Sequence, residues 1–206
     1  GPGAEFLGQG VAVEGALEEF VREELVREEG ALTLRATLRS SGLVGRLLFR
    51  RGAGESRLEL ATAGQPLTAL ADIPGRPEAV GWFSRGLFDA GVEVVQADGL
   101  PPGISFQFAA MDLSFDSPDG RYAGEGLQLM AHGSLRLADE PVVELEGGIA
   151  AGELLLGDFY RNFADAGLNF AGGGAWTAGG LELARIHVDD GGALALEAAA
   201  RPRAGG

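Results

Sequence analysis

The acidic stretch FDSPDGRYAGEGLQL is the first candidate for chemistry in this sequence. Its carboxylates, Asp116 and Asp119 foremost, are hard oxygen ligands of the kind that calcium takes. An EF-hand needs acids at alternate positions before its glycine, and DSPDG does not have them. In a turn, Pro118 would fix φ at the first central position and Gly120 would accept a positive φ. The residue types therefore favour a turn between two strands over a cation site.

Other catalytic arrangements are missing from the sequence. His132 and His187 stand in strand-like stretches outside any zinc-binding motif, and we expect both to face solvent. The chain has no cysteine and no GxSxG motif, and its glycine-rich segments lack the GK[ST] ending of a phosphate loop. We therefore expect no enzyme, no cofactor and no metal site. A carbohydrate-active enzyme stays open as the weakest alternative, because it needs only two carboxylates across a cleft.

Composition excludes two further classes of protein. The formal charge of −14 and a pI near 4.5 would repel a nucleic acid. No apolar run approaches the ~20 residues of a membrane-spanning helix. With 46% hydrophobic residues the chain can build a core, so disorder is not expected. The opening GPG is typical of a cleaved purification tag.

Most of the chain alternates apolar and other residues, with glycines between the alternating segments. From Leu32 to Leu38 the even positions are apolar and the odd ones are threonine or arginine, which is the period of a strand. The pattern continues to Ala198, and short spacers such as AHG and DDGG favour an antiparallel meander. We predict a mainly β fold in the form of a curved, rolled open sheet. A structural or interaction β-sandwich with a closed apolar core is the alternative, because periodicity cannot tell whether the apolar face is covered.

Three segments favour helices instead. Residues 15–30, GALEEFVREELVREEG, place Leu17, Phe20, Val21 and Leu25 on one helical face, which predicts an N-terminal amphipathic helix. A charged strand is the alternative there. Short helical turns are predicted before Pro74 and between Phe159 and Gly167. We therefore assign residues 1–9 to a tag scar and leader, and residues 10–206 to one elongated β domain. Within that domain we expect a helical lead-in at 10–31 and two portions of the sheet, at 32–100 and 101–206.

The last hundred residues resemble a known family in their pattern of apolar and glycine residues. The stretches LSFDSPDGRYAGEGLQLMAHGSLRLADEPVVELEGGIAAGELLLGDFY and FAGGGAWTAGGLELARIHVDDGGALALEAAARPR are glycine-punctuated xLxLxG strands. They resemble the C-terminal parts of the AsmA-like proteins of Gram-negative bacteria, above all the YdbH-like branch. The resemblance implies a β-groove without catalysis, in a periplasmic protein anchored in the inner membrane. Such a protein carries phospholipid toward the outer membrane along an apolar trough.

The resemblance also implies a site and partners. Phospholipid would be the ligand, and neighbouring domains of the same chain or a small partner would add strands to the sheet edges. One parity of the strands would line the trough. The candidate lining residues are Phe106, Phe108, Leu113, Phe115, Leu127, Leu129, Leu135, Leu137, Leu154 and Leu156.

Overall fold

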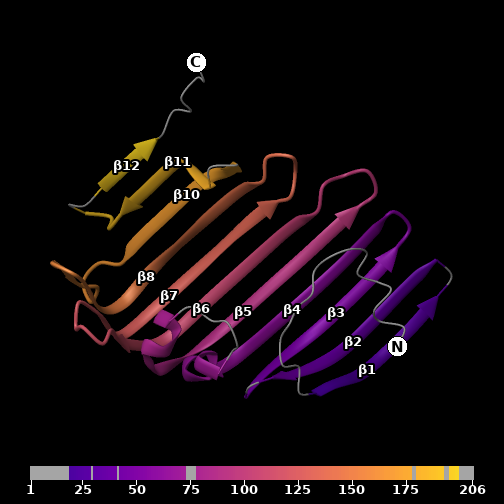
Figure 1. The fold of residues 1–206 in the computed structure, drawn as a ribbon, viewed down its shortest axis with the longest axis horizontal. Helices are drawn as coiled ribbons and strands as arrows, with labels where there is room; N and C mark the ends of the chain where they lie inside the picture. The colour runs from indigo at the N-terminus through magenta and orange to yellow at the C-terminus, as the bar shows by residue number, and fades with distance from the viewer. Residues whose placement is uncertain are drawn as a thin grey trace.

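The computed structural model describes residues 19–28, 30–40, 42–72, 78–177, 180–192 and 195–199. These residues form one antiparallel sheet of twelve strands, whose arrows run side by side in Figure 1. The strands are β1 (Glu19–Glu28), β2 (Ala31–Ser40), β3 (Leu43–Gly52), β4 (Glu55–Pro66), β5 (Phe83–Ala97), β6 (Gly103–Asp116), β7 (Tyr122–Arg136), β8 (Val142–Leu156), β9 (Phe159–Asn162), β10 (Leu168–Thr177), β11 (Gly180–Asp189) and β12 (Ala195–Ala199). Two 3-10 helices, η1 (Leu67–Asp72) and η2 (Glu78–Trp82), join β4 to β5.

The strands follow one another in sequence order across the sheet. The order is β1 to β8 and then β10 to β12, with the short β9 paired only to β8. β1 and β12 each have one neighbour, so the described sheet is not closed into a barrel. The prediction of a mainly β fold built as an antiparallel meander is confirmed.

The predicted N-terminal helix is wrong over the residues that the structure describes. Residues 19–28 form β1, an edge strand paired to β2, and the charged strand considered as the alternative is the correct interpretation. A register shift between Arg22 and Glu24 allows both Phe20, opposite Leu38, and Leu25, opposite Leu34, to share a face. This bulge explains why the apolar residues of the segment have the spacing that is typical of a helix. Leu17 and the remainder of the predicted lead-in lie outside the described residues.

The other two helical predictions have different outcomes. η1 begins at Leu67 and lies within the segment where a helical turn before Pro74 was predicted, so that turn is confirmed. The segment from Phe159 to Gly167 is not helical. It opens with β9, because the turn at Gly157, with φ of 63°, sends the chain back along the end of β8.

The two faces of the sheet differ in chemistry because side chains alternate along each strand. We call one face the apolar face; its residues at mid-strand from β3 to β8 are Leu47, Leu60, Val92, Phe106, Gly133 and Leu145, each opposite the next. We call the other the polar face; the neighbouring row from β4 to β8 is Glu59, Glu93, Ser105, Ser134 and Glu144.

Ion pairs cross the polar face between neighbouring strands. Arg57 lies 2.8 Å from Glu93, and Arg185 lies 3.3 Å from Glu144. These side chains are exposed, so each pair contributes at most about 1 kcal/mol to stability. Their arrangement is that of a sheet surface in contact with water.

A row of β-bulges crosses the middle strands near one end. Gly64 in β4, Gly86 in β5, Asp112 in β6, Gly126 in β7 and Gly152 in β8 all have positive φ. Each lies at a register shift against its neighbouring strand. Bulges bend a strand and increase its twist, so five adjacent bulges bend the sheet along one line.

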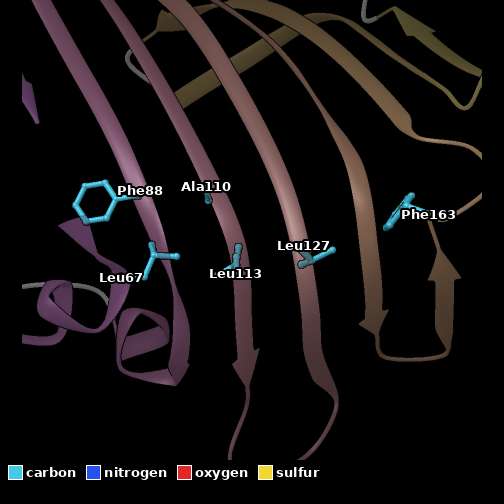
Figure 2. Packing of buried hydrophobic residues seen from close by; sticks show 6 residues of the cluster. All are labelled: Leu67, Phe88, Ala110, Leu113, Leu127 and Phe163. Atoms are coloured by element: carbon cyan, nitrogen blue, oxygen red, sulfur yellow. The ribbon is translucent and has the colours of Figure 1, made fainter. Parts of the chain in front are cut away.

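A buried cluster lies along this row of bulges, on the apolar face. Leu67 comes from η1 and Phe163 from the segment after β9, and both cover side chains of the sheet. Figure 2 shows the cluster spread across neighbouring strands, with η1 beside it. The members of the buried cluster are Leu67, Phe88, Ala110, Leu113, Leu127 and Phe163.

Phenylalanine rings on the apolar face lie across glycines of adjacent strands. A Cβ on Gly133 would come within 2.6 Å of Phe106 Cζ, and one on Gly147 within 2.7 Å of Phe170 Cζ. The absence of a side chain therefore lets each ring lie against the neighbouring backbone, a recognised way of filling the gap that glycine leaves in a sheet.

We expect Gly147→Ala to destabilise the sheet by about 1–3 kcal/mol, the usual cost of overpacking. The new methyl group would meet the backbone of Met130 and Ala131, which cannot move aside as a side chain can. Thermal unfolding measures the loss. Gly103→Ala is the matched control, since a Cβ there meets nothing within 4 Å. Equal melting temperatures for the two variants would show that Gly147 is not needed for packing.

Candidate functional site

The acidic stretch at residues 115–129 contains the turn between β6 and β7. The Gly120 N–H donates to Ser117 O at 2.9 Å, and Gly120 has φ of 67°. The Ser117 hydroxyl donates to Asp119 at 2.7 Å and accepts from the Tyr122 N–H at 2.9 Å. The predicted turn is confirmed, and the Asp119 carboxylate acts within it as a hydrogen-bond acceptor.

The turn lowers the pKa of Asp119 below its ordinary value of 3.8. The hydrogen bond from the Ser117 hydroxyl is the main cause, followed by the N–H of Arg121. Both bonds favour the charged carboxylate. The contribution of Asp119 to folding stability is therefore complete at pH values above the ordinary pKa. It is lost as the pH falls through the lowered pKa of the folded state.

We expect the Arg121 amide signal to report this titration. Its chemical shift should move with a midpoint below 3.8 as Asp119 takes up a proton, and Asp119→Ala should abolish the change. NMR over an acid pH series measures it. Asp139→Ala, in the turn between β7 and β8, is the control and should leave the transition in place. A midpoint above 3.8 in the unaltered protein would contradict the account.

The two histidines are exposed on strands, as predicted. His132 Nε2 lies 2.7 Å from Glu146, and His187 Nε2 lies 3.0 Å from Asp189. Asp190 is buried and pairs with Arg161 at 2.5 Å, which ties β9 to the end of β11. Within the described ranges, no three histidine or acidic side chains gather in a way that would hold a metal ion.

The predicted trough residues lie in three environments on the sheet. Leu113 and Leu127 belong to the buried cluster, and four others pack against it. Phe106 and Leu135 lie on the apolar face away from the cluster. Leu137 and Leu156, at strand ends, are 40% and 46% exposed. The four that pack against the cluster are Phe108, Phe115, Leu129 and Leu154.

The apolar face extends well beyond the predicted residues. Leu60 and Val92 are both 41% exposed and Leu145 is 39% exposed, although each lies in the row that contains Phe106. Their alternation was visible in the sequence and could have placed them in the same set. Leu67 and Phe163 were missed as part of the site because no periodicity signals a residue that covers a sheet from outside it.

The polar face is hollowed across several strands. A hollow of about 790 Å³ reaches from β4 to β11 and is lined by exposed side chains that include Gln107, His132 and Arg185. Two ion pairs lie within its walls: His132 with Glu146, and Arg185 with Glu144. Two more of its carboxylates, those of Glu59 and Glu93, pair with arginines beside it.

Comparisons with known proteins leave the site to be interpreted from its geometry alone. No protein-family model, curated protein or solved structure matches this chain. Among the described residues there is also no helix with the length and hydrophobicity to cross a bilayer. The resemblance to AsmA-like proteins therefore stays a prediction.

Proposed function

We propose that this chain is a segment of a periplasmic β-groove protein whose apolar face binds the acyl chains of phospholipids. One observation carries the proposal: the apolar face runs across a sheet that is not closed, and the buried cluster covers only its end at the bulges. Large side chains such as Leu60, Val92 and Leu145 stay about 40% exposed on it. An apolar surface of this extent is typical of a binding surface.

The chemistry of the face suits methylene chains. The inner strands pair on both sides, so their backbone N–H and C=O groups are already hydrogen-bonded and offer little to a polar ligand. Burial of each methylene group would contribute about 0.8 kcal/mol. Because such contacts have no direction, a bound lipid can shift along the face without breaking a specific bond.

The row of bulges supports the groove shape in this proposal. It bends five adjacent strands along one line, and η1 and Phe163 pack over the apolar face beside that line. The bent end forms the floor of the groove and the opposite strand ends form its opening, where a head group stays in water. A closed sandwich would need a second sheet over the face, and the described strands all belong to one sheet.

The edges of the sheet extend the proposal to transport between the inner and outer membranes. β1 and β12 each leave one side unpaired within the described sheet, so neighbouring domains or a small partner strand can continue it. Continued in this way, the apolar face would pass lipid from one segment to the next. The role is one of binding and conduction, without catalysis.

Native mass spectrometry of the protein purified from bacteria tests the proposal. We expect adducts with phospholipid masses, which dissociate when the protein is activated, and uptake of fluorescently labelled phosphatidylethanolamine by protein stripped of lipid. A clean mass together with no uptake of the labelled lipid would overturn the proposed function.

A further inference from the structure

The apolar face has one closed end and one open end along the direction of the strands. At the closed end Leu67 is 0% exposed and Phe163 is 1% exposed, and both cover the ends of β5 to β8. At the open end the turn between β5 and β6 carries Leu100, which is 63% exposed. Nothing among the described residues covers Val92 and Leu145, midway between, to the same degree.

The closed end is tightly packed. A Cβ on Gly86 would come within 2.7 Å of Leu67 Cδ1, so η1 sits directly on β5. On the other side, a Cβ on Gly152 would come within 2.6 Å of the Leu127 backbone. Leu67 is therefore in close contact with the bulge of β5, and the bulge of β8 lies close against the backbone of β7.

The open part has the length of a lipid tail. From Ile104, near the open end of β6, to Ala110, in the buried cluster, the strand advances six residues, or roughly 20 Å at ~3.3 Å per residue. The hydrocarbon of one bilayer leaflet is about 15 Å thick, half of the ~30 Å core. The tails of one phospholipid thus fit between the open strand ends and the cluster.

We infer that the buried cluster is an end-stop for the acyl chains. The terminal methyl groups abut Leu67 and the rings beside it, the head group lies at the turns that follow β5 and β7, and the position of Leu67 sets the longest chain that fits. This inference rests on the proposed function, because it assigns the orientation and chain length of the lipid that the apolar face binds.

Trp82 can report on this orientation. Trp82, in η2, directly precedes Phe83, which packs against the buried cluster at the closed end. Trp176 lies at the other strand end, in β10 next to Ala175, which pairs with Val142 at the start of β8. No other tryptophan is present. Trp176→Phe therefore leaves Trp82 as the single reporter, at the closed end.

Fluorescence quenching by phosphatidylcholine with a doxyl group on carbon 5 or carbon 16 of one tail tests the inference. In Trp176→Phe we expect the carbon-16 label to quench Trp82 about twofold more than the carbon-5 label. Uptake of both lipids with equal quenching, or with the opposite order at Trp82, would overturn the end-stop and leave the proposed function intact. No uptake of either lipid would overturn the proposed function and the end-stop with it.

Chain length supplies a second measurement. Leu67→Ala removes the side chain that we place at the end of the tails, so it should shift preferred uptake from 16-carbon toward longer saturated phosphatidylcholines. Leu100→Ala, at the exposed opposite turn, is the matched control and should leave the preference unchanged. A folded Leu67→Ala protein with an unaltered preference would show that Leu67 does not set chain length. Trp176→Phe leaves the buried cluster intact, so the quenching test stands if Leu67→Ala does not fold.

Discussion

Leu127→Ala is expected to lower the free energy of unfolding by about 2–5 kcal/mol, the range measured when a large buried aliphatic side chain is truncated. Leu127 is 3% exposed and lies in the buried cluster, so its truncation would leave a cavity there. For a chain of this size the melting temperature should fall by roughly 4–20 °C. Differential scanning calorimetry measures the change.

Leu145→Ala is the matched control for that experiment. It removes the same atoms from the same face, but Leu145 is 39% exposed and lies outside the buried cluster. We expect a smaller loss, of about 1–1.5 kcal/mol, because a side chain that is already 39% exposed has less buried surface to lose. Similar losses at both positions would mean that the whole apolar face is equally covered, and the distinction between a closed and an open end would then fail.

Phe106→Glu is expected to reduce the affinity for phospholipid by at least about tenfold, which corresponds to ~1.4 kcal/mol. The carboxylate would lie in the middle of the proposed acyl site, where methylene groups cannot solvate it. Because Phe106 lies away from the buried cluster, the protein should remain folded. Titration with labelled phosphatidylethanolamine measures the affinity, and circular dichroism checks the fold.

Gln107→Glu adds the same charge one residue away and is the control. Gln107 is exposed on the polar face, between Gly91 and His132 of the neighbouring strands. Its substitution should leave lipid affinity within about twofold, since the carboxylate stays in water. Equal losses for the two variants would indicate an effect of net charge, and the assignment of the site to the apolar face would be wrong.

The alternation along each strand made the sheet predictable from the sequence. Residues such as Phe106 and Phe108 alternate with Ser105 and Gln107, and only a strand places such residues on opposite faces. The short turn at Pro118 was equally readable, because proline fixes φ and glycine accepts the positive φ that the turn needs. These signals are local and do not depend on tertiary contacts.

The errors arise where the sheet departs from regular alternation. In β1 the bulge after Arg22 shifts the parity, so Phe20 and Leu25 acquire the spacing of a helix while pairing as a strand. The bulge at Asp112 has no special residue to announce it, since its φ of 55° belongs to a non-glycine residue. A bulge is decided by the partner strand as much as by its own residues, so one segment alone cannot reveal it.

The division of the apolar face into covered and uncovered parts also could not be predicted from the sequence. Phe106 and Leu129 have the same pattern of neighbours, yet only Leu129 packs against the buried cluster. The difference comes from η1 and the segment around Phe163, which reach the sheet from elsewhere in the chain. Such long-range contacts follow from the fold and leave no periodic trace.

Site-specific photo-crosslinking tests the central claim most directly. Benzoylphenylalanine placed at position 106 or at position 107 in otherwise unaltered protein, irradiated with phosphatidylethanolamine vesicles, compares two neighbouring residues on opposite faces. We predict a lipid adduct on the acyl chain from position 106 and none above background from position 107. An adduct from position 107 alone, or from neither position in protein that takes up lipid, would contradict the proposal that the apolar face binds the acyl chains.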